Sequence, residues 1–270
     1  MPGAEPALLA DAEDLPLLRD AAREAGRIAM GFFRRNPESW LKEGQSPVSA
    51  ADIAADRFLH ETLRSARPAY GWLSEETADG PDRLATDRVF VVDPIDGTRA
   101  FLAGLPTWCV SVAVVEKGRP VAGVLECPAK GEIFEALPGR GAFLNGRPIR
   151  VRPSSAKPEV AGPKAFVDAL PRRWREGMRR VPHVPSLAYR LAMIAKGELD
   201  ATFVRPNAHD WDLAAADLIL SEAGGLVLAE DREPPRYGLA AVPRHGALVA
   251  GSGPLLDAAA RAIASFPRLT

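Results

Sequence analysis

A short apolar segment that stops at two closely spaced carboxylates constrains this chain most. Residues 89–92 are all apolar, and the next residues are Asp93-Pro94-Ile95-Asp96-Gly97-Thr98. Such a segment before a proline is typical of a buried strand, and Pro94 is expected to end its ladder because it has no N–H to donate. We therefore expect Asp93 and Asp96 on a sharp turn at the carboxyl end of a strand, where open α/β sheets bind ligands.

The two residues after this pair suggest how the turn continues. Gly97 allows the backbone to approach another group closely, and Thr98 is expected to cap a short helix. Taken alone, Asp93 and Asp96 fit an Asx-turn with a helix cap as well as they fit a ligand site. The choice depends on whether further carboxylates occur at similar positions.

Three more segments place acids at strand ends or helix starts. Glu75 follows the short apolar strand expected over 70–73, and Asp212 lies in the first turn of a helix that Gly224-Gly225 closes. Asp52 enters an amphipathic helix. Each acid has an ordinary alternative, a solvated strand edge for Glu75 and a helix cap for the two aspartates.

Carboxylates gathered in one place would repel one another and raise each other's pKa unless a cation lay among them. Hard oxygen ligands without thiolate or histidine neighbours select magnesium or manganese rather than zinc. The four histidines show no HExxH or paired spacing, so a zinc site is not expected.

The periodicity of apolar residues predicts a mixed α/β chain. Helices are expected over 15–35, 51–65, 186–196, 213–223 and 254–265. Strands are expected over 70–73, 89–92, 108–115, 121–125 and 133–136, and near 160, 181, 201 and 247. Lys117-Gly118 and Asn145-Gly146 indicate hairpin turns. We expect one domain over 1–270, with halves of about 1–153 and 154–270.

The charge balance excludes several classes of partner. Lys and Arg number 34 against 35 acids, so the net charge of -1 provides no overall field for a nucleic acid polymer or an anionic membrane. The first 16 residues lack a basic n-region and an apolar core, and no run approaches 18 apolar residues. We expect a cytoplasmic protein with a small-molecule partner, and leave a homodimer open. Cys109 and Cys127 are expected to be buried thiols.

These motifs resemble the inositol monophosphatase superfamily, including its 3'(2'),5'-bisphosphate nucleotidase (CysQ-like) branch. The matching pieces are Ser74-Glu75-Glu76, Asp93 to Thr98, and Trp211-Asp212 with Ala223-Gly224-Gly225, in the same order and over roughly the whole chain. The resemblance implies a layered αβαβα sandwich and the magnesium-dependent hydrolysis of a phosphate monoester on a small metabolite.

The resemblance also implies a set of metal ligands. Glu75, Asp93 and the carbonyl of Ile95 would hold a first Mg²⁺ ion, and Asp93, Asp96 and Asp212 would hold a second. Glu75 would share a third, weaker ion, and Mn²⁺ is an alternative metal. Paired ions of this kind activate a water, neutralise the phosphoryl oxygens and stabilise the leaving alkoxide.

Further residues match positions that handle water and substrate. Asp52 and Thr98 match the pair that orients and helps to deprotonate the attacking water, and the N–H groups of Gly97 and Thr98 would bind a phosphate oxygen. Arg205 stands where inositol-specific members have an acid, and an arginine suits a second phosphate better than a polyol. Lys164 is a weaker candidate for nucleotide contact; for both cations a solvent-facing position is the alternative.

The first expectation for the substrate is therefore adenosine 3',5'-bisphosphate, followed by inositol 1-phosphate and then histidinol phosphate. A different class also stays open, namely a regulatory binding protein on the same fold without catalysis. The four metal-type carboxylates argue against it, because a pure scaffold has no physical need for them together.

Overall fold

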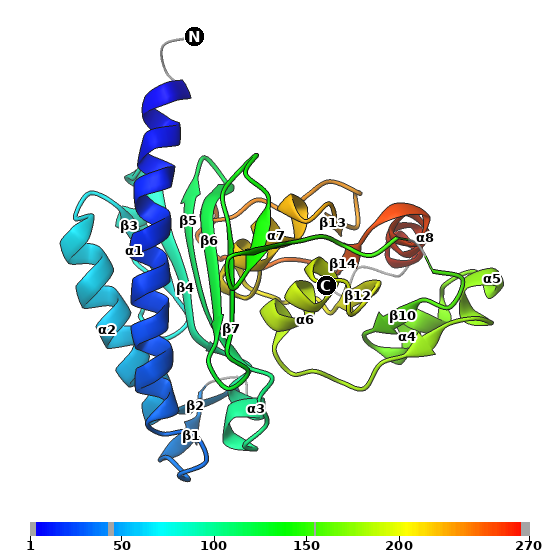
Figure 1. Ribbon diagram of the computed structural model, residues 1–270, viewed down its shortest axis with the longest axis horizontal. Helices are drawn as coiled ribbons and strands as arrows, with labels where there is room; N and C mark the ends of the chain where they lie inside the picture. Colours follow the sequence, from blue (N-terminus) through cyan, green and yellow to red (C-terminus); the bar gives the residue numbers. More distant parts are fainter. Residues whose placement is uncertain (1–3, 43–45, 154, 266–270) are drawn as a thin grey trace.

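In the computed structural model, which describes residues 4–42, 46–153 and 155–265, helices and two β-sheets alternate in layers (Figure 1). The order is a helical pair, a seven-stranded sheet, a second helical pair, a five-stranded sheet and an outer helical layer. Three clusters of buried apolar side chains fill the spaces between these layers. The expected αβαβα sandwich is confirmed.

The seven-stranded sheet carries most of the first half of the chain. Only its first pair is parallel, and every other neighbouring pair is antiparallel. The hairpin turns expected at Lys117-Gly118 and Asn145-Gly146 are confirmed, with positive φ at all four residues. In sheet order the strands are β3 (Gly71–Ser74), β4 (Arg88–Asp96), β5 (Cys109–Glu116), β6 (Arg119–Cys127), β7 (Glu132–Ala136), β8 (Ala142–Leu144) and β9 (Arg147–Ile149).

The helices α1 (Ala4–Met30) and α2 (Ala50–Ala66) cover one face of this sheet (Figure 1). Both are amphipathic, and their apolar sides bury Leu18 and Leu59 against the sheet. The helix α1 begins eleven residues before the expected start at Leu15 and ends before the expected Arg35. It also continues through Pro16, because packing on the sheet outweighs the one hydrogen bond that the proline removes.

The helices α6 (Leu187–Ala195) and α7 (Asp210–Glu222) form the middle layer between the two sheets (Figure 1). Most residues of both helices are buried, as expected for helices packed on two sides. The second sheet mixes parallel and antiparallel pairs in the order β11-β10-β12-β14-β13. Its strands are β10 (Glu159–Ala161), β11 (Arg179–Arg180), β12 (Ala201–Val204), β13 (Leu226–Ala229) and β14 (Leu248–Gly251).

The outer layer and the short elements complete the fold. The helix α8 packs on the free face of the second sheet, with α4 beside it. The remaining elements are α8 (Gly253–Ala264), α4 (Lys164–Asp168), α5 (Arg172–Arg175), the 3₁₀ turn η1 (Pro81–Ala85), α3 (Thr98–Leu102) and the hairpin of β1 (Ser39–Leu41) with β2 (Pro47–Ser49). Cys109 and Cys127 are buried free thiols, as expected.

The expectation that Pro94 ends its strand is wrong. The strand β4 continues to Asp96, and its pairing with β5 shifts register between Asp93 and Asp96. A bulge accommodates Pro94 because the extra residues need not donate to the ladder. Of the helices in the described residues, none is both long and apolar enough to cross a membrane.

Candidate active site

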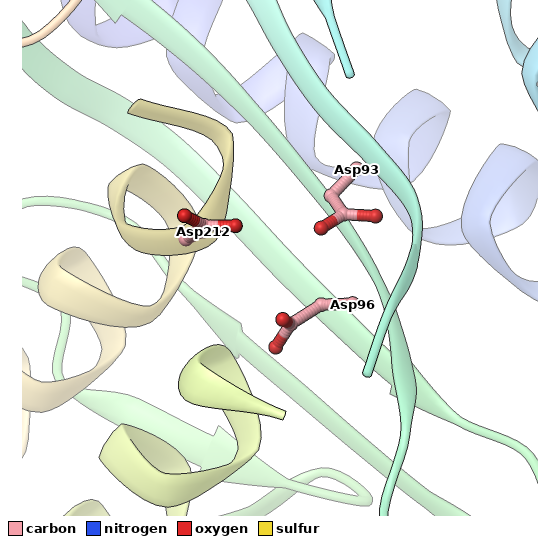
Figure 2. Close-up of side chains that lie close together, drawn as sticks. All are labelled: Asp93, Asp96 and Asp212. Carbon is pink, nitrogen blue, oxygen red and sulfur yellow. The ribbon is translucent and has the colours of Figure 1, made fainter. Parts of the chain in front are cut away.

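Three aspartates from two distant segments point toward one another at the carboxyl end of β4 in the seven-stranded sheet (Figure 2). One carboxylate oxygen from each of Asp93, Asp96 and Asp212 lies within 4.8 Å of the others. Asp93 and Asp96 come from the end of β4, whereas Asp212 comes from the first turn of α7. The sequence expectation that these acids meet is therefore met by the fold.

The bulge in β4 aims both of its aspartates at the same space. Asp93 pairs with Ser111 and Asp96 with Cys109 on β5, so the two residues between them loop out of the ladder. Asp93 Oδ1 accepts a hydrogen bond of 2.9 Å from the N–H of Ile95, which fixes the carboxylate across the bulge. A regular strand would also have offered these side chains less freedom to converge.

Asp96 lies at the start of α6, a contact that the sequence did not indicate. Its Oδ2 accepts hydrogen bonds from the Ser186 hydroxyl and from the N–H of Ala188 at 2.6 Å, and its Oδ1 accepts one from the N–H of Leu187 at 3.3 Å. A helix start stabilises a negative charge through its free N–H groups and its dipole. The middle layer therefore holds Asp96 in place.

Asp212 is positioned by its own helix. Its Oδ2 accepts a hydrogen bond of 2.7 Å from the N–H of His209, the residue before α7. The helix itself lies against β4, β5 and β6, so the carboxylate reaches the end of β4 from the opposite side. The cap that the sequence offered as an alternative is real, and it coexists with the convergence on Asp93 and Asp96.

Glu75 follows β3, which runs parallel to β4, so both strands end at the same edge. Its carboxylate lies outside the aspartate triplet but lines the same cavity. Lys42 Nζ lies 3.5 Å from Glu75 Oε1 and 2.6 Å from Glu76 Oε1, and it also donates to the Glu75 carbonyl. This lysine was not predicted, because it belongs to the β1–β2 hairpin, far away in the sequence.

The carboxylates raise one another's pKa in the way that their clustering predicts. Burial raises the pKa of Asp93 well above its usual value, and the charges of Glu75 and Asp96 raise it further. The pKa of Asp212 is raised by burial and then by Asp96, and that of Glu75 is raised mainly by burial. A cation would remove this repulsion, and carboxylate oxygens are the ligands that Mg²⁺ prefers, so the residues fit a metal site.

Asp52 and Thr98, the pair expected to handle water, are in contact. Thr98 Oγ1 lies 3.1 Å from Asp52 Oδ1 and 3.1 Å from the carbonyl of Ile95. Asp52 is buried, and its Oδ2 accepts hydrogen bonds from the backbone and hydroxyl of Ser49. The expected cap by Thr98 is wrong: Gly97 is the N-cap of α3 with φ +94°, and Thr98 is its first residue.

A cavity of about 150 Å³ lies among the clustered carboxylates, and we name it the acidic cavity; Asp52 and Ile95 are not in its lining. Ser46, Pro47, Arg99 and Pro185 complete its wall. Its lining from the predicted set is Glu75, Asp93, Asp96, Gly97, Thr98 and Asp212.

A larger cavity of about 630 Å³ shares Asp212 with the acidic cavity, and we name it the basic cavity. Arg205 and Lys164, the two predicted substrate contacts, both line it, and both are exposed. Lys164 forms an ion pair with Asp168 within its short helix. Three further cationic or titratable side chains of this cavity were not predicted, namely Arg180, His183 and Arg190. Of these three, only Arg190 had a signal in the sequence, because it lies one helical turn after Ser186 at the start of a predicted helix.

Comparisons with known proteins agree with this geometry. A sequence profile described as the inositol monophosphatase family matches residues 11–266. The chain is 36% identical over 223 residues to "Inositol monophosphatase 2" of Solanum lycopersicum, covering 77% of this chain and 84% of the relative. It is 33% identical over 244 residues to a "Histidinol-phosphatase" of Mycobacterium tuberculosis, covering 86% of this chain and 92% of the relative. The crystal structure of extragenic suppressor protein suhB from Bartonella henselae superposes with a TM-score of 0.78 at 29% identity, covering 94% of this chain and 100% of that one.

Proposed function

This chain belongs to the inositol monophosphatase family and is a hydrolase of phosphoric monoesters, and we propose that it acts on a small soluble metabolite with Mg²⁺ ions held at the acidic cavity. The observation that carries the proposal is the convergence of Asp93, Asp96 and Asp212 within 4.8 Å, with Glu75 on the same cavity. Buried acids in such numbers repel one another unless they are protonated or a cation lies among them.

We assign the ligands as the resemblance to the family implies. Glu75, Asp93 and the carbonyl of Ile95 would hold one ion, Asp93, Asp96 and Asp212 would hold a second, and Glu75 would share a third. Asp93 lies within 4.8 Å of Asp96 and Asp212 and lines the same cavity as Glu75, which supports its role as the bridging ligand. Mn²⁺ has the same preference for oxygen ligands and would be an alternative.

The ions would supply Lewis acidity, lowering the pKa of a bound water and neutralising the phosphoryl oxygens. Thr98 and Asp52 would act on that water as a pair. The Thr98 hydroxyl has both Asp52 Oδ1 and the Ile95 carbonyl within reach, and when it donates to Asp52 its lone pairs would accept a hydrogen bond from the water. A proton would then pass from the water to Thr98 Oγ1 as the hydroxyl proton moves to Asp52, whose pKa is raised by burial.

The phosphate group would lie beside Gly97 and Thr98, whose backbone N–H groups begin α3 at the wall of the acidic cavity. The left-handed φ of Gly97 supports this assignment, because it turns the chain from β4 into α3 at that point. A Cβ at this position would come within 2.9 Å of Ser186 Cβ, so glycine is also required for packing.

For the substrate we propose adenosine 3',5'-bisphosphate, with inositol 1-phosphate and histidinol phosphate as the alternatives. Arg205 and Lys164 on the basic cavity favour a substrate with a second phosphate, since arginine pairs bidentately with phosphate oxygens. The names of the similar proteins favour the two monophosphates. A panel of these three compounds and fructose 1,6-bisphosphate decides between them.

The test is phosphate release by the purified protein with Mg²⁺ and with excess chelator. We expect turnover that requires Mg²⁺ and is inhibited by Ca²⁺, which prefers a larger and looser coordination shell. We expect the highest kcat/KM on the bisphosphate nucleotide. Full activity in chelator would contradict the metal assignment. Binding of a substrate without any turnover would favour the regulatory binding protein, and a preference for inositol 1-phosphate would replace the proposed substrate.

A further inference from the structure

Arg190 is a half-buried arginine whose hydrogen-bonding capacity is mostly unused. It lies in the first turn of α6, and its Nη1 donates to Thr202 Oγ1 at 3.2 Å. Its Nε is buried and has no hydrogen-bond partner. An unpaired buried donor on a charged group is costly, so the position calls for an acceptor that the described residues do not supply.

The side chain of Arg190 borders open space. It lines the basic cavity and also a neighbouring cavity of about 310 Å³, and Arg180 and His183 line both cavities as well. The anchoring bond to Thr202 on β12 fixes one corner of the guanidinium. The guanidinium group otherwise has no acceptor among the described residues, and a bidentate contact is the geometry in which arginine binds phosphate and carboxylate.

The surroundings of Arg190 are positively charged. Among the described residues, neither Arg190 nor its neighbours Arg180 and Arg205 forms an ion pair with a carboxylate, and Arg180 donates only to the carbonyl of Gly162. Burial lowers the pKa of His183, and the charges of Arg190, Arg205 and Arg99 lower it further, as expected for a residue that lines a cavity with Arg190 and Arg205. Such a field attracts anions.

The carboxylates nearest to this field are engaged elsewhere. Asp96 and Asp212 attract Arg190, yet Asp96 accepts three hydrogen bonds at the start of α6 and Asp212 accepts one from His209. In the proposed function both acids also bind metal ions, which would neutralise them. Arg190 then has no counterion of its own.

We propose that Arg190 is the specificity-determining residue of this enzyme and binds a second anionic group of the substrate in the basic cavity. The inference rests on the proposed function for the reacting phosphate, but not for the anion site itself. The substrate class is a phosphate monoester that carries a further oxyanion, either a second phosphate or a carboxylate. Arg205 and Arg180 are exposed and would attract the anion, whereas the guanidinium of Arg190, anchored on Thr202 and lining the cavity, would hold it.

The anion site can be tested without catalysis. Titration of sulfate into the protein in excess chelator, at ionic strength held constant with chloride, measures binding by calorimetry. We expect saturable binding in the parent and an affinity at least about tenfold weaker in Arg190→Met, the effect of losing a hydrogen bond to a charged group. Arg190→Lys should fall between the two. Arg172→Met, at an exposed arginine of α5, is the matched control and should bind like the parent.

A kinetic measurement then identifies the anion. The ratio of kcat/KM for adenosine 3',5'-bisphosphate to that for inositol 1-phosphate should fall about ten- to a hundredfold in Arg190→Met, mostly through KM. A fall in the ratio of kcat/KM for 3-phosphoglycerate to that for inositol 1-phosphate in Arg190→Met would instead show that Arg190 binds a carboxylate. Sulfate binding that is absent in the parent, or equal in Arg190→Met and the parent, would overturn the proposal. If the parent hydrolyses none of these esters, the proposed function fails while the sulfate titration still decides the anion site.

Discussion

The acidic and basic cavities meet at Asp212 but are built in opposite ways. Each carboxylate of the acidic cavity stands at a strand end or a helix start, and Asp93, Asp96 and Asp212 all accept backbone hydrogen bonds. The cations of the basic cavity extend from loops and short elements, and Arg180 and Arg205 are exposed. Arg190 is the exception, since α6 and Thr202 hold it.

This difference matches two separate tasks, catalysis at the acidic cavity and substrate selection at the basic cavity. A reaction centre needs charges held to within a fraction of an ångström, which elements packed on both sides can provide. Substrate choice can change through exposed side chains on loops without disturbing the fold. Similar proteins with different names, such as an inositol monophosphatase and a histidinol-phosphatase, are consistent with this division.

Removing one charge from the acidic cavity should have the largest effect. In Asp93→Asn we expect kcat/KM to fall by about a thousandfold or more, because the residue is proposed to bridge two ions. Calorimetry should show loss of Mg²⁺ binding. In chelator, the same variant should unfold at a higher temperature than the parent, since one of several repelling carboxylates is gone.

Asp257→Asn, at an exposed acid of α8, is the matched control for this variant and should change neither activity nor Mg²⁺ affinity. Asp212→Asn should lose mainly the second ion. Mg²⁺ binding that is unchanged in Asp93→Asn would show that the ligand assignment is wrong.

The water-handling pair should affect turnover but not the ions. In Thr98→Ala we expect kcat to fall by about a hundredfold, the lower range for loss of a proton-transfer group, with Mg²⁺ affinity nearly intact. Thr98→Ser keeps the hydroxyl that contacts Asp52 and should retain most of the activity. A large fall in Mg²⁺ affinity in Thr98→Ala would instead make this residue part of the metal site.

Mg²⁺ bound at the acidic cavity and sulfate bound at the basic cavity should stabilise the folded protein to different extents. Mg²⁺ at about a hundred times its dissociation constant should raise the free energy of unfolding by about 2.7 kcal/mol, because it binds only the folded cluster. Sulfate at the basic cavity should stabilise less at equal concentration, since its site is more open to water. Thermal unfolding in chelator with each ion added separately measures both. A larger effect of sulfate than of Mg²⁺ would reverse the comparison.

A buried carboxylate outside both cavities shows what burial alone does to a pKa, without the effect of neighbouring carboxylates. Asp217 on α7 accepts a hydrogen bond of 2.9 Å from the Tyr237 hydroxyl, and burial raises its pKa to about 6. The folded state therefore holds this proton more tightly than the unfolded state, so the residue costs stability as pH rises from about 4 to 6. Above that range the cost is constant.

Asp217→Asn should accordingly stabilise the protein at pH 7.5, by roughly 1–3 kcal/mol, and the gain should shrink as pH falls toward 4.5. The amide oxygen can still accept from Tyr237, so the hydrogen bond is retained. Urea unfolding at several pH values measures the difference, with Asp257→Asn as the exposed control. A gain independent of pH would assign the effect to packing rather than to charge.

The smallest effect is expected at the entrance of the basic cavity. Arg205→Ala should weaken binding of the bisphosphate substrate by about two- to fivefold, because exposed ion pairs contribute roughly 0.2–1 kcal/mol. Arg180→Ala should do no more. Measured KM values for these variants rank them against Arg190→Met. If KM for the bisphosphate substrate rose as much in Arg205→Ala as in Arg190→Met, Arg205 would be the main contact of the anion instead.

Much of the acidic cavity could be predicted because its residues lie in short motifs with local signals. An apolar run before Asp93 indicates a strand, and the Gly-Gly after residue 223 closes the helix that begins near Asp212. The bulge at Pro94 was missed because a proline in a strand signals either an end or a bulge, and only the pairing partner decides.

By itself the sequence determined the kinds of groups that could act, the elements that carry them and the order of those elements. These properties are local, since strand and helix periodicity act over a few residues. Only the tertiary structure decided that Ser186 donates to Asp96, that Lys42 meets Glu75, and that Arg190 faces a cavity with an unpaired Nε. Those contacts join residues from 33 to 90 positions apart, and they depend on how α6 and the β1–β2 hairpin pack beside the sheet edge, which no local pattern encodes.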